Sequence, residues 1–565
     1  MKGDFAHYAE DPYVAPGYTR APLTDTVEVV VIGGGFGGLL AGARLREAGE
    51  QRIRMIEAGG DFGGTWYRNR YPGAACDMEA YIYLPLLEEL GVMPPRRFAH
   101  GAEILAHSQA IARHFDLYRD ACFQTRVTQL EWNEAEALWT IRTNRDDCMR
   151  ARFVVMSNGP LNRPKLPSIP GIESFKGHTF HTSRWDYAYT GGGPDGGLVG
   201  LKDKHVAIIG TGATAVQCVP HLAASAQQLY VFQRTPSSVD LRNDRPTDPE
   251  WAASLKPGWQ RERIENFTTL LAGGMADVDP VMDGWTEAAR NFSAIVSDDR
   301  SVLSSPEKFI AAMELADARK MTQLRGRVDS VVQDPDTAAE SLKAWYRQFC
   351  KRPCFHDDYL QAFNRPNVKL VDTQGRGVQR LTDKALVSDG VAYEVDAIIF
   401  ATGFEVGTGY TRRSGYDLVG RDGQTLSDKW GPGMRTLHGM MTHGFPNLII
   451  LGPPQGALTA NFPHALDEQG RHAAYLIQQA QARKVRSMEP TVEQEDTWVK
   501  TIILSTRRNQ AFLESCTPGY YNNEGQPDAR GIQNSAYGLG GMAYFKLIAA
   551  WRDADEFSGL KLTYN

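Results

Sequence analysis

Two glycine-rich loops, each set between a hydrophobic strand and a helix, constrain the fold of this chain more than any other feature. The first lies at residues 27–57, VEVVVIGGGFGGLLAGARLREAGEQRIRMIE, where Gly33, Gly35 and Gly38 form the pattern G-x-G-x-x-G. These glycines allow a tight turn, a close approach to a pyrophosphate and close packing of helix on strand, and the helix start attracts phosphate. Glu57, at the end of the second strand, can accept hydrogen bonds from a ribose and would repel a 2′-phosphate. The unit therefore predicts a site for FAD.

A second unit lies at residues 205–234, HVAIIGTGATAVQCVPHLAASAQQLYVFQR, where Gly210, Gly212 and Ala215 give the variant G-x-G-x-x-A. It differs from the first unit at the end of its second strand, where Arg234 stands at the spacing of the acid. A guanidinium forms forked, charge-assisted hydrogen bonds to phosphate. This unit therefore predicts a site for NADPH, whose ribose carries a 2′-phosphate.

The two units predict an α/β protein with two Rossmann-like dinucleotide-binding domains. The apolar segments 153–159 and 397–403 are typical of closing strands near a dinucleotide, and their separation predicts a discontinuous FAD domain. Segments that begin with Ser-Pro or Asp-Pro, such as 305–321 and 334–349, show helical periodicity. The predicted parts are an FAD-binding domain at 1–165 and 396–565, an NADPH-binding domain at 166–236 and 346–395, and a helical insertion at 237–345.

Composition narrows the class of protein. With 565 residues, 42% hydrophobic and 23% charged, the chain has the balance of a globular protein. Its formal charge of −6 gives no reason to expect a nucleic acid or an anionic membrane as partner. No apolar run is long enough to span a membrane and no signal peptide is visible, which favours a cytoplasmic location. The seven cysteines form no C-x-x-C, so we expect reduced thiols and neither a metal site nor a dithiol centre.

Two long motifs lie between the second strand of the first unit and the second glycine loop. The first, GGTWYRNRYPGAACD, begins at Gly63, and the second, FKGHTFHTSRWD, begins at Phe175. Together with the later pair Lys351-Arg352, they make the chain resemble the type I, FAD-containing Baeyer–Villiger monooxygenases. The fingerprint of that family, F-x-G-x-x-x-H-x-x-x-W followed by Pro or Asp, is met by Phe175, Gly177, His181, Trp185 and Asp186.

The resemblance implies an NADPH-dependent flavoprotein monooxygenase. In that family NADPH reduces FAD, O2 adds to give a C4a-peroxyflavin, and a ketone becomes an ester or lactone. Arg352 would then stabilise the anionic species and Asp77 would orient Arg352, while Lys351 and Arg234 would hold the 2′-phosphate. His181 would couple the domains rather than transfer a proton.

The residues expected to contact the two cofactors come from both loops and from the motifs between them. Tyr520 stands where many family members carry a tryptophan that contacts the nicotinamide, so a hydroxyl could replace an indole N–H there. The full set is Gly33, Gly35, Gly38, Glu57, Thr65, Trp66, Asp77, Tyr83, Gly210, Gly212, Thr214, Ala215, Gln217, Arg234, Thr235, Lys351 and Tyr520.

Three alternatives remain to be separated from a Baeyer–Villiger enzyme. A flavin monooxygenase acting on nitrogen or sulfur has a fingerprint that ends in Tyr or Phe, whereas Trp185 and Asp186 stand here. A disulfide reductase would need a cysteine partner for Cys76, and a redox-responsive scaffold would need neither Asp77 nor Arg352. The expected partners are a small-molecule ketone, bulky or cyclic by analogy with relatives that share the N-terminal extension, and O2.

Overall fold

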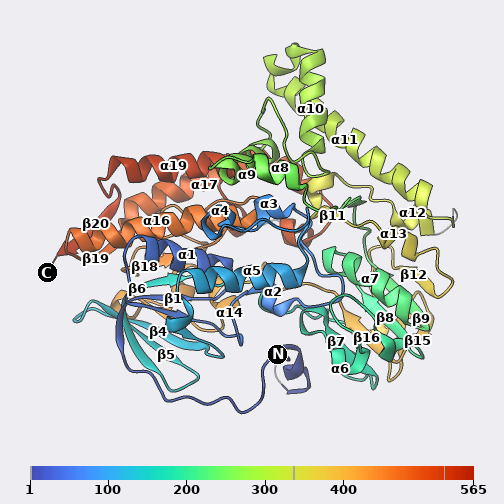
Figure 1. Ribbon diagram of the computed structural model, residues 1–565, viewed down its shortest axis with the longest axis horizontal. Helices are drawn as coiled ribbons and strands as arrows, with labels where there is room; N and C mark the ends of the chain where they lie inside the picture. The colour runs from blue at the N-terminus through green and yellow to red at the C-terminus, as the bar shows by residue number, and fades with distance from the viewer. Residues whose placement is uncertain (1–2, 335–337, 527–528, 565) are drawn as a thin grey trace.

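The computed structural model describes residues 3–334, 338–526 and 529–564 and contains two separate sheets rich in parallel strands (Figure 1). The first sheet has the order β17-β4-β5-β6-β1-β2-β3, with β18 paired to β6. Residues 29–31 are fully buried, as expected for a strand covered on both faces. The strands are β1 (Thr26–Ile32), β2 (Ile53–Ile56), β3 (Ala121–Cys122), β4 (Val127–Asn133), β5 (Leu138–Thr143), β6 (Cys148–Met156), β17 (Leu418–Val419) and β18 (Leu448–Ile450).

A layer of helices covers one face of this sheet, and two further strands form a separate small sheet. The helix after the first glycine loop, α1 (Phe36–Glu47), packs between α5 (Gly101–His114) and α16 (Phe462–Ala482) (Figure 1). The other elements of this part are α2 (Thr65–Arg68), α3 (Ala80–Tyr83), α4 (Leu87–Leu90), α14 (Tyr410–Ser414), α15 (Leu426–Lys429), α17 (Val492–Glu514), α18 (Ala529–Gln533), α19 (Gly541–Ala554), β19 (Val485–Pro490), β20 (Leu560–Tyr564) and the 3-10 helices at Tyr118–Asp120, Arg421–Gly423 and Tyr520–Gly525.

The second sheet is fully parallel and has the order β12-β9-β8-β16-β7. Its strands are β7 (His178–His181), β8 (His205–Ile209), β9 (Gln228–Gln233), β12 (Val368–Asp372) and β16 (Ala397–Phe400). Around it lie α6 (Tyr187–Thr190), α7 (Ala213–Ser225), α13 (Tyr359–Ala362), the 3-10 helices Thr182–Arg184 and Val199–Leu201, and the small sheet of β13 (Arg380–Leu381), β14 (Ala385–Ser388) and β15 (Val391–Glu394).

The position of β16 corrects one predicted boundary. We expected the segment 397–403 to reopen the FAD domain, but β16 pairs with β8 and β7 in the second sheet. The strand that returns to the first sheet is β18, which pairs with β6. Segments 153–159 and 397–403 are therefore equivalent closing strands of two different sheets, and we propose that the chain returns to the first domain after Gly403.

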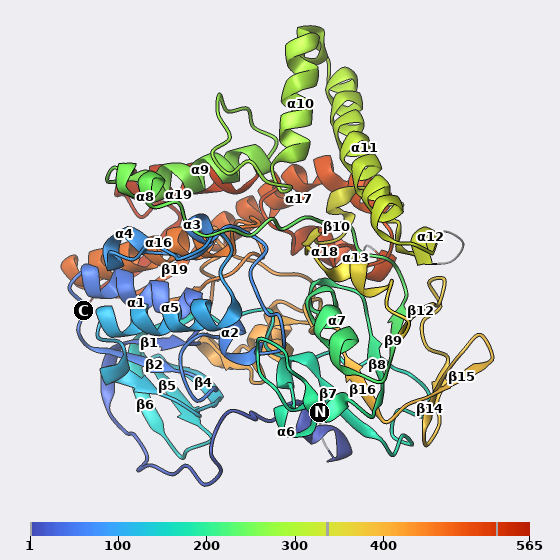
Figure 2. The same ribbon diagram turned by 45° about the vertical axis from the view of Figure 1, so that its right-hand side comes forward.

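The insertion is helical, and part of it projects from the body (Figures 1 and 2). The projecting arm consists of α10 (Glu287–Asp298) and α11 (Pro306–Val331), which pack against each other. Helix α11 begins as predicted, with Pro306 in its first turn and the Ser305 side chain accepting a hydrogen bond from the backbone N–H of Lys308 (3.3 Å). The remaining elements are α8 (Pro249–Ser254), α9 (Trp259–Leu271), α12 (Ala338–Leu342), the 3-10 helices Arg300–Ser304 and Gln348–Cys350, and the strand pair β10 (Val239–Asp240) and β11 (Cys354–Phe355).

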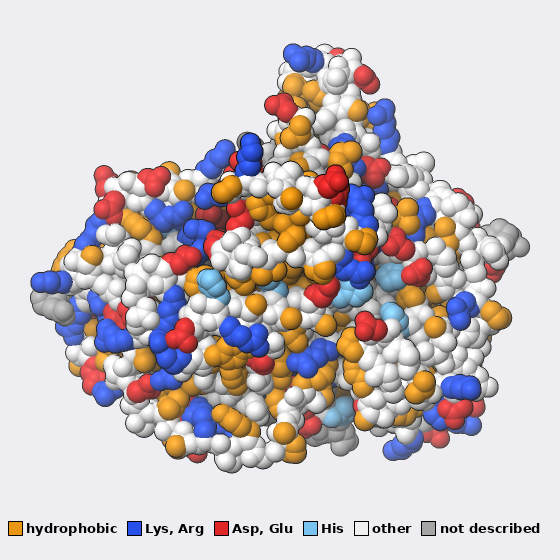
Figure 3. All heavy atoms as spheres, viewed as in Figure 1, with side chains coloured by type: hydrophobic (Ala, Val, Ile, Leu, Met, Phe, Trp, Pro, Cys, Tyr) orange, Lys and Arg blue, Asp and Glu red, His pale blue; other side chains and the backbone are white. Residues whose placement is uncertain are grey.

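The surface agrees with the weak net charge. On the face in Figure 3, acidic and basic side chains are intermingled rather than gathered into one field. Among the described residues, none of the helices combines the length and the apolar character needed to cross a bilayer. Within the same ranges, no group of three or more His, Cys, Asp or Glu is placed to hold a metal ion.

The N-terminal extension joins the two sheets. Tyr8, in the 3-10 helix Gly3–Tyr8, donates a hydrogen bond to Thr179 of β7 (2.5 Å) and packs edge-on against Phe400 of β16. Further along, Arg20 forms an ion pair with Asp147 beside the first sheet (2.5 Å). The extension therefore contacts the second domain and the first within about 25 residues of chain.

A disulfide between Cys350 and Cys516 overturns the expectation that all thiols are reduced. The two cysteines are 166 positions apart, so no local spacing announced the bond. It ties the 3-10 helix Gln348–Cys350, directly before Lys351, to the segment that follows α17.

A thiol titration tests this bond. Unfolded without reductant, the protein should show the five free cysteines 76, 122, 148, 218 and 354, and all seven after reduction. Cys516→Ser should expose a sixth thiol, because it frees Cys350. Seven reactive thiols in the protein purified and unfolded without reductant would contradict the disulfide.

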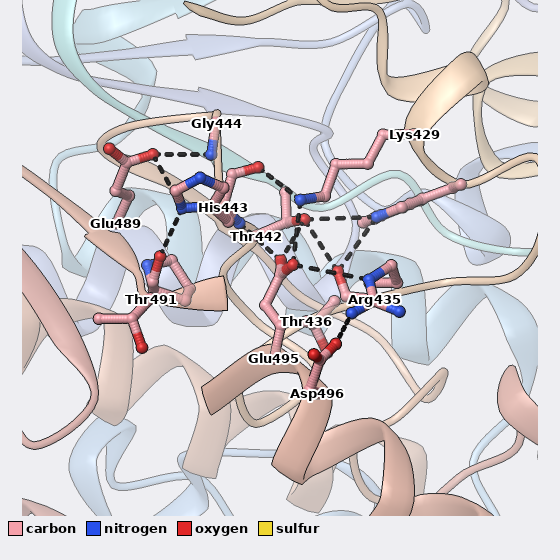
Figure 4. A network of polar contacts seen from close by, with 12 residues as sticks. Lys429, Arg435, Thr436, Thr442, His443, Gly444, Glu489, Thr491, Glu495 and Asp496 are labelled. Atoms are coloured by element: carbon pink, nitrogen blue, oxygen red, sulfur yellow. Dashed lines mark hydrogen bonds and ion pairs between the residues drawn. The ribbon is translucent and has the colours of Figure 1, made fainter. Parts of the chain in front are cut away.

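The N-terminal end of α17 is held by a network of hydrogen bonds and ion pairs (Figure 4). Glu495 is 1% exposed and accepts hydrogen bonds from Lys429 (3.0 Å), from the Thr442 hydroxyl (2.8 Å) and from the His443 backbone N–H (2.6 Å). Next to it, Asp496 pairs with Arg435. Helix α17 is thus held at its start by ion pairs and near its end by the disulfide.

Candidate functional site

The first glycine loop has the geometry of a phosphate cradle. Gly33 has a φ of +112°, and a Cβ there would clash with the backbone oxygen of Ser157. A side chain on Gly38 would clash with the Gly33 carbonyl, so this glycine permits the close contact between α1 and β1. Gly35 caps α1 without a side chain, which leaves backbone N–H groups at the helix start for an anion. The residues present therefore fit the pyrophosphate of FAD.

Glu57 lies beside this loop as predicted. Its carboxylate accepts hydrogen bonds from the backbone N–H groups of Gly34 (2.6 Å) and Gly59 (2.5 Å), and the Arg68 guanidinium lies 4.0 Å away. These contacts hold the acid at the end of β2, next to the start of α1. An adenosine ribose is the group that such an acid binds in this type of loop.

Aromatic side chains line the same region. Thr65 opens α2, and Trp66, the next residue, donates its indole N–H to the Tyr83 hydroxyl (2.8 Å). Tyr83 also packs edge-on against Phe36 in the first turn of α1. Tyr83 and its partner Trp66 thus lie next to the first turn of α1, and their contacts with FAD, like that of Thr65, stay predictions.

The second glycine loop repeats the first. Gly210 has a φ of +110°, and its Cβ would lie 2.5 Å from the Ala401 carbonyl, the counterpart of Ser157 in the first sheet. Gly212 caps α7 and has no heavy atom within 4 Å of its virtual Cβ among the described residues. Thr214 and Ala215 follow in the first turn of α7. An open helix start with glycine around it fits the pyrophosphate of NADPH.

Gln217 lies in α7 and contacts the segment that carries Asp77. It is buried, its side-chain oxygen accepts a hydrogen bond from Tyr71 (2.9 Å), and its amide N–H group donates to the Ala75 carbonyl (2.9 Å) and to Asp77 (3.3 Å). Both ends of the amide are therefore hydrogen-bonded to protein, and its contact with the cofactor stays a prediction. Gln217 thus joins α7 to the segment that carries Asp77.

The buried Asp77 forms an ion pair with Arg352, whose side chain is 32% exposed. Nη1 of Arg352 lies 2.7 Å from Oδ2 of Asp77, whose side chain is 2% exposed. Trp285 donates its indole N–H to the Asp77 carbonyl (2.8 Å), and the Arg352 guanidinium lies over its ring at 5.7 Å. Both predicted catalytic residues thus meet, although they are 275 positions apart in the chain.

A second arginine completes this cluster, and sequence reasoning missed it. Nη2 of Arg242 lies 2.8 Å from Oδ1 of Asp77, so one carboxylate bridges two guanidinium groups. Asp77 and Arg242 are 165 positions apart, so no sequence motif contains both residues. The cluster of Asp77, Arg242 and Arg352 carries a net charge of about +1.

The protonation states in this cluster follow from its contacts. Burial alone would raise the pKa of Asp77, but Arg352 and Arg242 hold that pKa below the ordinary value. Burial alone would lower the pKa of Arg352, but Asp77 holds it above the ordinary value. Asp77 is therefore ionised and Arg352 remains a cation, which can stabilise negative charge that develops on an oxygen.

The fingerprint residues pack within the second domain. His181 ends β7, its Nδ1 accepts a hydrogen bond from the Ser183 backbone N–H (3.2 Å), and its Nε2 lies 3.0 Å from the Gly403 carbonyl. Burial, reinforced by Arg184, lowers the pKa of His181 to about 3, so its ring is neutral. Neutral His181 bonds to the segment that follows β16, where the chain leaves the second sheet.

The remaining fingerprint residues support that connection. Phe175 and Trp185 are buried, and Gly177 has no room for a side chain, because its Cβ would meet the Phe175 ring at 2.5 Å. Asp186 caps α6 by accepting from the Tyr189 backbone N–H (3.1 Å) and pairs with His178 (2.9 Å).

The residues predicted to hold the 2′-phosphate lie at one edge of the second domain. Arg234 follows β9, and the Thr235 backbone carbonyl accepts a hydrogen bond from the Thr211 hydroxyl (2.9 Å). Lys351 lies between the disulfide and Arg352, and burial lowers its pKa to about 8, with Arg234 as the next cause. Tyr520 begins the 3-10 helix Tyr520–Gly525, but its side chain lies outside the described residues.

Comparisons with known proteins agree with this site. A family model described as an NAD(P)-binding Rossmann-like domain matches residues 31–90. The neopentalenolactone D synthase of Streptomyces avermitilis is 54% identical over 564 residues, covering 99% of this chain and 94% of that protein. A Baeyer–Villiger monooxygenase of Streptomyces coelicolor is 49% identical over 552 residues, covering 97% and 91%.

A solved structure extends the likeness to the whole fold. The polycyclic ketone monooxygenase of the thermophilic fungus Thermothelomyces thermophila superposes with a TM-score of 0.92 at 39% identity, covering 100% of this chain and 94% of that one. Identity and coverage this high, together with the two glycine loops, the fingerprint and the Asp77–Arg352 pair, show that the chain belongs to the Baeyer–Villiger monooxygenase family.

Proposed function

We propose that this enzyme uses FAD, NADPH and O2 to convert a bulky or cyclic ketone to an ester or lactone. The observation that carries the proposal is the buried cluster in which Asp77 holds Arg352, linked through Gln217 to the helix that follows the second glycine loop. Both loops offer the backbone N–H groups that dinucleotides need. An arginine in this position can stabilise the negative charge that develops on oxygen during such a reaction.

Each residue of the cluster has a defined task. FAD, when bound, supplies the redox chemistry that activates O2. Arg352 places a permanent positive charge where the reacting oxygen becomes negative, and Asp77 fixes the direction in which the guanidinium points. Arg242 keeps Asp77 ionised from the other side.

His181 and its fingerprint partners act by position rather than by proton transfer. The neutral ring lacks the acidic proton of an imidazolium, and its single N–H is engaged by the Gly403 carbonyl. We assign His181, Trp185 and Asp186 to holding the connection between the two domains.

The names of the relatives support a polycyclic substrate. One is a neopentalenolactone D synthase and another a polycyclic ketone monooxygenase. A panel from small cyclic ketones to steroids, with NADPH and O2 consumption and product analysis, tests the proposal. Ketone-dependent consumption with ester or lactone as product is expected. Oxidation of sulfides or amines without any ketone product would favour the nitrogen- and sulfur-oxygenating alternative.

Arg234→Ala is expected to weaken NADPH binding by about ten- to a hundredfold, because a charge-assisted phosphate contact contributes roughly 1.5–3 kcal/mol. NADH lacks the 2′-phosphate, so its KM should barely change. Steady-state kinetics with both nucleotides measure this difference. An unchanged KM for NADPH would show that Arg234 does not hold the phosphate.

A further inference from the structure

A carboxylate lies between the cations that would hold the 2′-phosphate. Oε2 of Glu524 is 3.0 Å from Nη2 of Arg234, and its Oε1 is 3.3 Å from Nζ of Lys165. The two cations come from distant parts of the chain, and both pair with this side chain. One carboxylate, with its two oxygens on two different cations, imitates the way a phosphate is bound.

The segment that carries Glu524 is built to present it there. The disulfide fixes Cys516 at the start of the segment, and the Pro518 carbonyl accepts a hydrogen bond from Lys351 (3.4 Å). Asn522 is buried, and its side-chain oxygen accepts from the backbone N–H groups of Gly519 (2.9 Å) and Gly525 (3.1 Å). Glu524 thus projects from a closed turn against the edge of the second domain.

The charge balance around this turn favours an anion stronger than one carboxylate. Lys351 is near enough to Arg234 and Glu524 for both to affect its titration, and burial with Arg234 lowers its pKa to about 8. Arg234, Lys165 and Lys351 therefore carry up to three positive charges opposite the single charge of Glu524. A phosphate carries about two charges and three acceptor oxygens, which suits the same cations better.

We propose that Glu524 occupies the 2′-phosphate position when no nucleotide is bound, and that NADPH must displace this carboxylate from Arg234 and Lys165. This inference rests on the proposed role of Arg234 in binding NADPH. Glu524 then lowers the affinity for nucleotides that carry a 2′-phosphate and has no effect on those without one. When NADPH displaces Glu524, segment 516–525 also loses the ion pairs that hold it against Arg234 and Lys165.

The test is binding of adenosine 2′,5′-bisphosphate and of 5′-AMP to the oxidised, flavin-loaded enzyme, measured by calorimetry. Glu524→Gln is expected to bind the bisphosphate about two- to tenfold more tightly, since an exposed ion pair no longer competes, and to bind 5′-AMP as the parent enzyme does. Glu514→Gln makes the same change of charge on α17, where the carboxylate accepts a hydrogen bond from Gln510 (2.7 Å), and should change neither affinity.

Arg234→Ala distinguishes failure of the displacement by Glu524 from failure of the phosphate site itself. If it weakens bisphosphate binding while Glu524→Gln leaves that binding equal or weaker, Glu524 is not a competitor, and the displacement is overturned although the phosphate site stands. If Arg234→Ala leaves bisphosphate binding unchanged, the phosphate site itself is wrong.

Discussion

Replacing Arg352 by alanine should lower the rate of oxygen insertion by about 10²–10³, the usual cost of losing one donor to a developing oxyanion. Because the lost group is a full positive charge paired with the buried Asp77, the decrease could exceed this range. Reduction of the bound flavin by NADPH needs no oxyanion, so it should survive. NADPH would then be consumed with release of hydrogen peroxide in place of ester or lactone.

Stopped-flow absorbance of the flavin and product analysis together measure this separation of steps. Arg347→Ala is a matched control, because Arg347 lies in the same stretch of chain but pairs with Glu314 at the surface (2.7 Å). It should keep both reduction and product formation. Ester or lactone formed by Arg352→Ala at the parent rate would contradict the role assigned to this arginine.

Local features were predicted well because their physics is local. A strand, a glycine loop and a helix are consecutive in the chain, so Gly33 and Gly210 could be identified as loop glycines from the sequence alone, and both have a positive φ. Glu57 of the first unit and Arg234 of the second follow their glycine loops at the same spacing in the sequence. The start of α11 at Pro306 follows from the same kind of short-range signal.

Features that depend on which strands pair were not predictable in this way. Segments 153–159 and 397–403 look alike, since each pairs in parallel with the strand that precedes a glycine loop, and the sequence does not say which sheet each one joins. The disulfide and the contact of Arg242 with Asp77 join residues more than 160 positions apart. Gln217 has the right place in its motif, yet its amide turns toward Tyr71 and Asp77 because the two domains meet there.

Asp77 bridges two arginines, so its loss should affect stability as well as catalysis. In Asp77→Asn the Arg242 guanidinium, 10% exposed, keeps its charge but loses its counter-ion. Removing one partner of a buried ion pair typically costs about 3–5 kcal/mol of unfolding free energy. Product formation should also fall, though less than in Arg352→Ala, because Asp77 positions the arginine without contacting the reacting oxygen.

The pH dependence of this loss has a definite sign. Burial would raise the pKa of Asp77, but the two arginines hold it below the ordinary value. Its contribution to stability is therefore fully present above the ordinary carboxyl pKa and is lost as the pH falls through the lowered one. The difference in stability between the parent enzyme and Asp77→Asn should shrink in acid and be constant near neutrality.

A double-mutant cycle decides whether the bridge causes these effects. Arg242→Leu in the Asp77→Asn background removes the unpaired charge, so the double variant should lose less stability than the two single variants summed, by about 0.5–3 kcal/mol. Asp147→Asn breaks another buried pair, with Arg20, and should destabilise the protein without uncoupling NADPH consumption from product. Chemical denaturation gives the free energies, and strict additivity of Asp77→Asn and Arg242→Leu would show that the carboxylate does not bridge the two arginines.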